Sequence, residues 1–427
     1  MTKKIVLSVN AGSSSVKVSV YSAAFNQPPV QLAEAKVSGL TAPPAKLDYT
    51  RRGKEVTKDG NVEDKIESQG DAFGVLLQTL IEDKDLPEIS SEADVAFVCH
   101  RIVHGGDYAR PALISDETYY HLEKLNDLAP LHNAPSLTIV KRCMRELSAA
   151  RNIACFDSQF HATLPEHVRT YPIDQDIARG NHLRKYGFHG ISYAFVTRAA
   201  AEFLGSEPKN VNIIALHLGS GASACAIRAG ESVDTSMGLT PLAGLPGATR
   251  SGSVDPSLVF HYASDVGRLA PASTKELHIS RAEEILNKEA GWKALTGTTD
   301  FGVIASKAFP SSGEPDPTMR LAFDLFVDRV CAFIGSYYVS LRGQVDALIF
   351  AGGIGEKSQR LRAAVVDQIG CLGFALDKEA NKGVKFDRDH VVREIGAAEA
   401  KHRVLVCQTD EQFEMARACA EDGEFWR

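Results

Sequence analysis

The sequence predicts an α/β protein that is built from two similar halves. An apolar strand at 4–9, a Gly/Ser-rich turn and a second strand at 15–21 form a β-hairpin near the start of the chain. The same arrangement returns about 200 residues later, at 211–228, which is the pattern of an internal duplication. Strands and helices alternate around both hairpins, and this alternation is typical of α/β architecture.

Further elements follow each hairpin. Helices are expected where apolar residues recur every three or four positions, and strands where short apolar runs occur. In chain order these are a helix at 71–84, strands at 95–99 and 152–156, helices at 191–204 and 317–342, strands at 346–350 and 404–408, and a last helix at 411–421. The Pro-, Gly- and charge-rich residues 38–66 and 309–317 are expected to form surface loops or irregular extensions.

Length, charge and cysteine usage exclude several classes of protein. The 427 residues suffice for two or three domains, and the formal charge of −7 argues against a nucleic-acid or anionic-membrane surface. The eight cysteines are scattered without a C-x-x-C pair, so we expect reduced, mostly buried thiols and no disulfide or zinc framework. The first apolar run is too short for a signal sequence, and no run approaches the ~18 apolar residues of a membrane span, which predicts a cytoplasmic protein.

Two Gly-rich turns within the hairpins are candidate phosphate contacts. In NAGSSSVK at 10–17, a glycine and small hydroxyls let backbone N–H groups approach an anion, and Lys17 adds a charge. A Ser-rich turn with a solvated lysine is the alternative for this motif. The second turn, GSGAS at 219–223, loosely matches a dinucleotide fingerprint. The residues after it are strand-like where that fingerprint requires a helix, so a phosphate-facing hairpin is favoured over a dehydrogenase.

A third Gly-rich stretch, AGGIGEKS at 351–358, also follows a predicted strand. It resembles a Walker phosphate-binding loop, but a glutamate separates its last glycine from its lysine, so the required Gly-Lys-Ser order is absent. The glycines favour close approach of the backbone to a flat ligand, such as a nucleotide base or ribose.

Charged residues and histidines stand at the ends of predicted elements, where ligand sites of α/β proteins lie. HRIVHGG at 100–106 follows a strand, and its two histidines lack the glutamate of a zinc-binding helix, so structural histidines are favoured. His189 lies between glycines, and Arg250 lies in a Gly-rich loop. Asp157 and Glu411 also lie at element ends, although such acids are more often caps or surface charges.

Together these residues resemble the acetate kinases, members of the acetate and sugar kinase/Hsc70/actin superfamily. The matching motifs run in order along nearly the whole chain, and HRIVHGG, YGFHG and DTSMG are the specific ones. They are NAGSSSVK (10–17), HRIVHGG (100–106), APLHNAP (129–135), FDSQFH (156–161), YGFHG (186–190), HLGSGAS (217–223), DTSMGLTPLAGL (234–245), TRSGSVDP (249–256), AGGIGE (351–356) and TDEQ (409–412).

The resemblance implies a two-lobed, actin-like (ribonuclease H-like) duplicated fold with the substrates in a central cleft between the lobes. The first lobe is expected at 1–160 plus 408–427, and the second, which would bind the nucleotide, at 161–407. The family pairs as homodimers through the second lobe. It transfers the γ-phosphoryl group of ATP reversibly to acetate, with Mg²⁺ or Mn²⁺, giving acetyl phosphate and ADP.

The resemblance also implies roles for individual residues. Catalysis would involve Asn10, Arg101, Asp157, His189 and Arg250, and the metal would lie near Asn10 and Glu411. The acetate would be held by Arg101 in an apolar pocket of Val103, Leu131, Phe188 and Pro241. Phosphate and nucleotide contacts would come from Ser13, Ser15, Lys17, His217, Gly219, Ser220, Gly221, Asp300, Phe301, Gly353, Ile354, Gly355 and Arg362, with His132 as a secondary site histidine.

These roles are chemically consistent with one another. Phosphoryl transfer needs in-line positioning and neutralisation of charge more than covalent chemistry, and two arginines, a histidine and a metal ion supply both. A carboxylate nucleophile is already ionised at pH 7, so no strong general base is required. Asp157 is therefore expected to orient Arg101 or the metal shell.

Several positions depart from the family pattern, and some of them lie on the nucleotide side. They include Ser220, Ala243, Ser253, Gly302, Lys357 and Gln412. A pyrophosphate-dependent acetate kinase therefore stays an alternative, although the branch with that activity carries bulky residues where Gly353 and Ile354 leave space for a nucleoside. Propionate or butyrate as the acceptor, and an actin- or Hsp70-like ATPase that binds a protein partner, are further alternatives.

Overall fold

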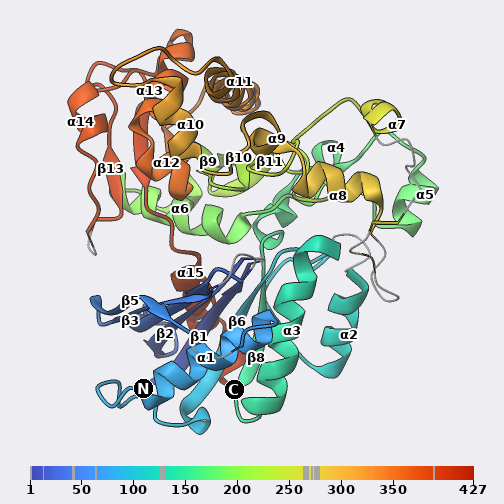
Figure 1. The fold of residues 1–427 in the computed structure, drawn as a ribbon, viewed down its shortest axis with the longest axis vertical. Coiled ribbons are helices and arrows are strands. Elements are labelled where there is room, and N and C mark those ends of the chain that lie inside the picture. Colours follow the sequence, from blue (N-terminus) through green and yellow to red (C-terminus); the bar gives the residue numbers. More distant parts are fainter. Residues whose placement is uncertain are drawn as a thin grey trace. The chain divides into compact units, whose positions relative to one another are not determined.

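The computed structural model describes residues 2–12, 14–40, 44–62, 65–125, 130–262, 269–270, 273, 279–387 and 390–427, without the side chains at 130–132 and 262. Their contacts divide the chain into two compact units. The first comprises Met1–Gln159 and Asp410–Arg427, and the second comprises Phe160–Thr409. Each unit has its own sheet and its own hydrophobic core (Figure 1).

The first unit contains an eight-stranded sheet in the order β5-β4-β3-β2-β1-β6-β8-β7. Strands β1 to β5 pair antiparallel in sequence, whereas β1, β6 and β8 are parallel neighbours. The strands are β1 (Lys4–Ala11), β2 (Ser15–Ala23), β3 (Val30–Ser38), β4 (Lys46–Arg51), β5 (Lys54–Asn61), β6 (Val95–Ile102), β7 (Ala112–Leu113) and β8 (Arg151–Phe156). The predicted hairpin and the two later strands are thus confirmed.

Strands β4 and β5 correct the prediction of an irregular segment at 38–66. Both strands are rich in charged residues, which conceals the alternation that marks a strand. Tyr49 of β4 is nevertheless buried in the core, and its hydroxyl donates to Asp83 at 2.5 Å. The segment therefore widens the sheet at one edge.

Helices cover both faces of this sheet. Helices α1 and α3 pack on one face, and α15, the last long helix of the chain, packs on β1, β2 and β6 from the other. The helices of this unit are α1 (Gln69–Glu82), η1 (Glu92–Asp94), α2 (Asp116–Lys124), α3 (Pro130–Glu146), α15 (Glu411–Glu421) and α16 (Gly423–Trp426), and η3 (Gln159–Thr163) follows β8. The helices predicted at 71–84 and 411–421 correspond to α1 and α15.

The second unit contains a six-stranded sheet in the order β11-β10-β9-β12-β14-β13. Its antiparallel strands β11, β10 and β9 continue into the parallel neighbours β12 and β14, which repeats the order β3-β2-β1-β6-β8 of the first unit. The strands are β9 (Ile213–Leu218), β10 (Ala222–Arg228), β11 (Glu231–Thr235), β12 (Ala347–Ala351), β13 (Val392–Glu394) and β14 (Arg403–Cys407). The predicted duplication is therefore present in the topology of the two sheets.

Helices also lie on both faces of the second sheet. Alternate residues of β9 face the long helix α11, and the others face α6. The remaining helices are short. The helices are α4 (Glu166–Arg169), α5 (Gln175–Gly180), α6 (Gly190–Phe203), η4 (Pro208–Asn210), α7 (Leu258–Tyr262), α8 (Arg281–Lys288), α9 (Gly291–Thr296), α10 (Phe301–Ala308), α11 (Pro317–Ser340), α12 (Gly352–Lys357), α13 (Gln359–Gln368), η5 (Gly370–Leu372) and α14 (Lys378–Lys382).

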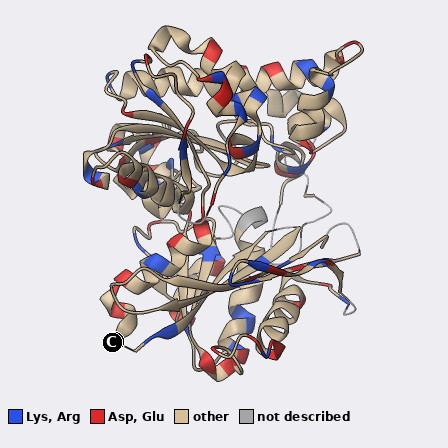
Figure 2. Cartoon of the chain, turned by 90° about the vertical axis from the view of Figure 1, so that its left-hand side faces the viewer, with Lys and Arg blue, Asp and Glu red and all other residues tan. Residues whose placement is uncertain are grey.

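Surface charge and cysteine burial agree with the composition. Figure 2 shows acidic and basic residues interspersed over the described parts of both units. All eight cysteines are free thiols, and seven of them are buried, while Cys371 is exposed. None of the helices in the described part of the chain is both long enough and apolar enough to cross a membrane.

Candidate functional site

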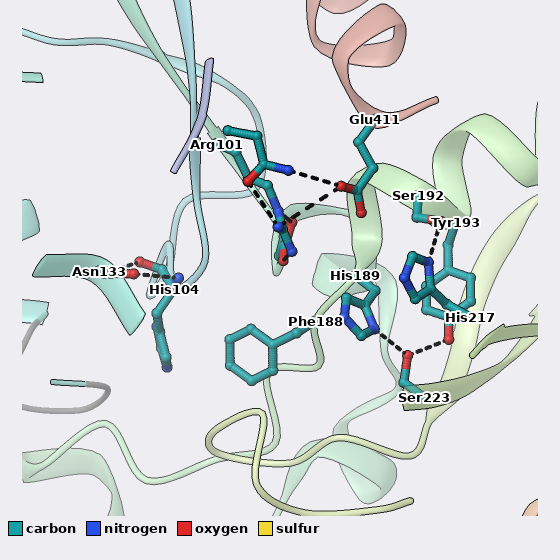
Figure 3. Close-up of polar contacts among 12 residues, drawn as sticks. Arg101, His104, Asn133, Phe188, His189, Ser192, Tyr193, His217, Ser223 and Glu411 are labelled. Carbon is teal, nitrogen blue, oxygen red and sulfur yellow. Dashed lines mark hydrogen bonds and ion pairs between the residues drawn. The ribbon is translucent and has the colours of Figure 1, made fainter. Parts of the chain in front are cut away.

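A cluster of polar side chains lies at the carboxyl ends of three neighbouring strands of the first unit (Figure 3). Arg101 near the end of β6 donates from Nε and Nη2 to the two carboxylate oxygens of Asp157, at 3.0 and 2.6 Å. Its Nη1 donates to the amide oxygen of Asn10 on β1 at 3.2 Å. Glu411 at the start of α15 accepts from the Asn10 amide at 3.5 Å, and its carboxylate lies 3.9 Å from Arg101 Nη1.

The carboxylates set the charge of this cluster. Burial by itself would lower the pKa of Arg101, but the negative charges of Asp157 and Glu411 outweigh it and raise that pKa well above its usual value. Asp157 is 1% exposed, and its backbone N–H also donates to Ile102 at 3.0 Å. Such a two-point ion pair fixes the plane of the guanidinium group. Arg101 is therefore a permanently charged cation with a fixed orientation.

The last helix places Glu411 in this cluster through its neighbour Gln412. The Gln412 side chain donates to the backbone oxygen of Ser8 at 3.0 Å, and the Ser8 hydroxyl donates back to the Gln412 backbone oxygen at 2.8 Å. Asp410 caps the helix by accepting from the Phe413 N–H at 2.9 Å. Glu411 is thus held beside β1, although it lies about 400 residues away in the chain.

Lys17 of the N-terminal hairpin, a candidate phosphate contact, forms an ion pair within the first unit. The Lys17 ammonium group pairs with Glu34 of β3 at 2.9 Å, and both side chains are 35% exposed. The turn is closed by the Gly12 N–H, which donates to the Ser15 oxygen at 2.8 Å. Lys17 is therefore a half-exposed cation. Ser13 lies outside the described residues.

The histidines of HRIVHGG are structural. His100 is buried and donates to Asn152 at 2.9 Å, and burial lowers its pKa to about 4. His104 is buried, and its backbone exchanges hydrogen bonds with the Asn133 side chain at 2.9 Å. Val103 between them is half-buried. Leu131 and His132 belong to α3, but their side chains lie outside the described part of the structure.

A second polar network is built around His189 in the second unit (Figure 3). His189 precedes α6 and has a left-handed backbone (φ 59°), a conformation that is uncommon for residues other than glycine. Its Nδ1 lies 2.8 Å from the Ser223 hydroxyl, and the Tyr193 hydroxyl lies 2.5 Å from the same oxygen. Ser223 belongs to β10 and Tyr193 to α6, so both elements fix the imidazole.

His217 at the end of β9 extends this network. Its ring stacks on that of His189, with centroids 4.2 Å apart and planes at 26°. Its Nδ1 lies 2.8 Å from the Ser192 hydroxyl, which in turn lies 2.8 Å from the Thr409 hydroxyl. Each histidine therefore has a hydroxyl at Nδ1. Ser223 belongs to the motif GSGAS, but the sequence assigns no such role to it or to Ser192.

The side chains of His189 and Arg250 both lie beside Gly221. A methyl group added at Gly221 would lie 3.0 Å from Nη1 of Arg250 and 3.7 Å from Nε2 of His189. The turn between β9 and β10 is further held by the Gly219 N–H, which donates to Gly221, and by Ser220, which accepts from Ala248 at 2.8 Å. A guanidinium group and an imidazole nitrogen thus flank a glycine turn, as an anionic ligand requires.

A cavity of about 540 Å³ adjoins the same glycine turn. It is lined by six of the positions expected to contact phosphate or nucleotide, and also by residues to which the motifs assign no role. The expected ones are Gly219, Ser220, Asp300, Phe301, Gly353 and Ile354, and the others are Trp292, Thr299, Gly302, Lys357, Ser358, Gln359 and Arg360. Such a volume suits a ligand of nucleoside size.

Comparison with known proteins decides the family. The family model described as "Acetokinase family" matches residues 5–417. A probable acetate kinase of Neurospora crassa is 69% identical over an alignment that covers 100% of this chain and 95% of that protein. The chain belongs to the acetokinase family.

Solved structures of this family have the same fold. The crystal structure of Porphyromonas gingivalis acetate kinase matches with a TM-score of 0.79 and 31% identity, over 97% of this chain and 98% of that one. A propionate kinase from Francisella tularensis matches with a TM-score of 0.80 and 29% identity, over the same shares. The predicted two-domain actin-like α/β fold is therefore confirmed.

Arg362 departs from its expected role in this acetokinase-family chain. Its side chain is 1% exposed and does not line the cavity. The guanidinium group donates to the carbonyls of Gly355 and Glu356, at 2.8 and 2.7 Å, and to Asn381. Burial lowers its pKa to about 10. These hydrogen bonds tie the guanidinium group to the backbone of α12, so in this structure Arg362 supports that helix.

Three other nucleotide-side positions serve the backbone or the core. The Asp300 carboxylate caps α10 by accepting from Gly302 and Val303. Phe301 is 4% exposed and packs edge-on against Trp292. Gly355 is buried in α12. Gly353 is exposed and Ile354 is half-buried, and both line the cavity.

Phe188 and Pro241, which are expected in the acetate pocket, are both buried. The Phe188 backbone oxygen lies 3.0 Å from Nε2 of His161, whose Nδ1 lies 2.7 Å from the Ser232 hydroxyl. Burial lowers the pKa of His161 to about 4, so this imidazole is neutral at pH 7. His161 thereby fixes the backbone just before His189.

A divalent cation is compatible with the donor set around Glu411. Mg²⁺ prefers oxygen ligands and is usually bound through one or two carboxylates together with waters and substrate phosphates. Glu411 offers a carboxylate that is 15% exposed, with the Asn10 amide beside it. Asp157 is less suitable, since both its oxygens already accept from Arg101. Among the described residues, no group of three or more His, Cys, Asp or Glu side chains forms a ready metal cage.

Proposed function

We propose that this chain catalyses the reversible transfer of the γ-phosphoryl group of ATP to acetate, giving acetyl phosphate and ADP. The observation that carries this proposal is the pair of Arg250 and His189 on either side of Gly221. A transferring phosphoryl group spreads negative charge over its equatorial oxygens, and a guanidinium with an imidazole donor neutralises that charge. The names of the relatives support the same reaction.

Arg101 is the proposed holder of the acetate carboxylate. Its guanidinium is kept charged and oriented by Asp157 and Asn10, so it can offer a fixed positive group to a small anion. An ionised carboxylate attacks phosphorus without losing a proton, so the cluster needs no general base. Asp157 then acts on Arg101 and not on the substrate.

The phosphoryl donor is proposed to be ATP. The cavity beside Gly219 and Gly353 has the volume of a nucleoside site, whereas pyrophosphate would leave it empty. A side chain at Gly353 would meet no atom within 4 Å, so the cavity is open at this position. Lys357, Gln359 and Arg360 at its rim provide further polar contacts for a ribose or a phosphate.

Mg²⁺ is the proposed metal, with Glu411 as its protein carboxylate and Asn10 next to it. When bound, the ion would shield the phosphate charges of the nucleotide. The chain itself holds Glu411 in place through the hydrogen bonds of Gln412 to β1. A cytoplasmic homodimer remains the expectation from the resemblance.

The direct test traps the acyl phosphate as a hydroxamate, with acetate, propionate or butyrate as acceptor and ATP or pyrophosphate as donor. We expect acetyl hydroxamate with ATP and Mg²⁺, and its loss in Arg101→Ala. If hydroxamate forms with pyrophosphate and not with ATP, the assignment of ATP as the donor is refuted. If propionate is clearly preferred to acetate, propionate replaces acetate as the assigned acceptor. If the rate of ATP hydrolysis does not depend on any of the three carboxylates and is unchanged in Arg101→Ala, an actin-like ATPase is supported.

A further inference from the structure

A second cavity of about 670 Å³ lies in the same unit, and the reaction described above does not use it. Most of its wall is apolar and comes from α13, from Phe309 and from the residues after η5, including Phe374 and Leu376. The volume is within the ~300–1,000 Å³ of small-molecule sites. It is larger than the cavity beside the glycine turn.

The charges at this second cavity favour an anion. Three of its lining residues are cations, Arg360, Lys378 and Lys382, and a single carboxylate, Asp367, opposes them. Lys382 pairs with Glu379 at 2.9 Å, whereas Lys378 makes no ion pair within the described residues. The guanidinium group of Arg360 lies 4.8 Å from the centroid of the Phe309 ring, which forms part of the cavity wall. A flat or acyl body with one anionic group complements this combination.

The two cavities share structural elements. Gln359 and Arg360, at the start of α13, line both of them. Asn381, which lines the second cavity, donates to the Gln359 oxygen at 2.9 Å and accepts from Arg362 Nε at 2.8 Å. Arg362 in turn holds the carbonyls of α12, the helix that carries Gly353. Movement of α13 or α14 on ligand binding would therefore be transmitted to the first cavity.

We propose that the second cavity binds a small organic anion with an apolar body, and that its occupancy changes the affinity of the first cavity for the nucleotide. The binding itself is independent of the function proposed above. The coupling rests on that function, because it assumes that the first cavity holds ATP. Coupling of this kind is reciprocal, so ATP would change the affinity of the anion by the same factor.

The binding is tested with the aromatic sulfonate 8-anilino-1-naphthalenesulfonate, whose fluorescence rises in apolar surroundings. The titration uses the full chain with saturating ATP and Mg²⁺, so that the first cavity is occupied. We expect one saturable site that is weakened at least tenfold in Lys378→Glu and in Ala363→Trp, which places an indole in the cavity from an exposed position. Lys385→Glu is the control, since this lysine is exposed and does not line the cavity.

A second probe separates charge from hydrophobicity. N-phenyl-1-naphthylamine has the same aromatic body without the sulfonate, and we expect it to bind at least tenfold more weakly. Equal binding of the two probes would overturn the anion assignment. If Lys378→Glu and Ala363→Trp leave dye binding unchanged, the dye does not bind in the second cavity and the proposed site is wrong. The same conclusion follows if ATP displaces the dye completely.

The coupling is read from kinetics in the acyl hydroxamate assay. We expect saturating 8-anilino-1-naphthalenesulfonate to change the KM for ATP at least threefold in the unaltered chain and not in Ala363→Trp. An unchanged KM in the unaltered chain would overturn the coupling. If ATP supports no turnover at all, the proposed function fails, whereas the dye titration of the three variants still decides the second site.

Discussion

The hydroxyl of Ser223 lies 2.8 Å from Nδ1 of His189. The Tyr193 hydroxyl lies 2.5 Å from the same Ser223 oxygen and can donate to it. Ser223 can then donate to Nδ1, which leaves the proton of a neutral imidazole on Nε2, the atom that faces Gly221. With this direction of the hydroxyl chain, the neutral imidazole offers its Nε2 N–H to an anion beside Arg250.

We predict that Ser223→Ala lowers kcat about tenfold, because one net hydrogen bond is worth about 1–1.5 kcal/mol. The KM for ATP should change less than twofold, since Ser223 does not line the nucleotide cavity. Steady-state hydroxamate kinetics measure both constants. Ser236→Ala is the matched control, because this buried serine accepts from the Ala224 N–H and makes no contact with His189. Equal losses of kcat in both variants would contradict a positioning role.

We predict that Asp157→Asn raises the KM for acetate and lowers kcat/KM about 100-fold. The substitution removes one charge of a buried pair, so Arg101 loses both its orientation and its countercharge. Breaking a buried pair also costs about 3–5 kcal/mol, so the variant should melt at a lower temperature. Acetate kinetics and thermal unfolding are measured in parallel. Asp83→Asn, which breaks the ion pair with Arg51 away from the cluster, should destabilise the chain and leave the KM for acetate unchanged.

The sequence predicts the sheets far better than it predicts the polar networks. Strand periodicity and the two Gly-rich turns locate β1, β2, β9 and β10, because alternation and turn chemistry are local signals. Strand β4 was missed, since its solvent-facing lysine and aspartate conceal the buried Tyr49. Ser192 and Ser223 were also missed as partners of the histidines, because their roles depend on the pairing of β9 with β10 and on the packing of α6.

Arg362 shows why a motif position is insufficient to assign a contact. The family resemblance places Arg362 on the nucleotide side, and in the structure its guanidinium donates to two carbonyls of α12 and to Asn381. A cation drawn into the interior by backbone carbonyls has no distinct sequence pattern. Two of the departures from the family pattern, Gly302 and Lys357, line the first cavity.

We predict that Gly353→Val raises the KM for ATP at least tenfold and changes the KM for acetate less than twofold. A Cβ at this position meets no atom within 4 Å, so the new side chain fills ligand space without straining the chain. Gly180→Val, at a second glycine with open surroundings and no cavity, is the control. If Gly353→Val leaves the KM for ATP unchanged, the nucleoside does not occupy this cavity.

We predict that removal of Mg²⁺ with EDTA abolishes turnover and that Glu411→Gln raises the Mg²⁺ concentration for half-maximal rate about 10–100-fold. The carboxamide keeps the size of the side chain but loses the charge that a hard cation prefers. Excess Mg²⁺ should restore much of the rate in Glu411→Gln. Glu414→Gln is the control, because that carboxylate pairs with Arg417 on the same helix. A rate that Mg²⁺ does not restore would mean that Glu411 acts only on Arg101.

We predict that the free energy of unfolding falls as the pH falls from about 6.5 to about 4, partly because of His161. Burial lowers the pKa of His161 from 6.5 to about 4, so in this window the unfolded chain binds a proton that the folded chain does not. The loss reaches roughly 3 kcal/mol at the low end of the window. Urea unfolding followed by circular dichroism at pH 7, 6 and 5 measures this loss.

His161→Gln should flatten the slope of the unfolding free energy against pH, and His167→Gln, at an exposed position, should leave this slope unchanged. Burial lowers the pKa of His100 in the same way, so His100 accounts for the part of the pH slope that remains in His161→Gln. An identical slope in His161→Gln and the unaltered chain would show that folding does not lower the pKa of His161, which would contradict the effect of burial on this imidazole.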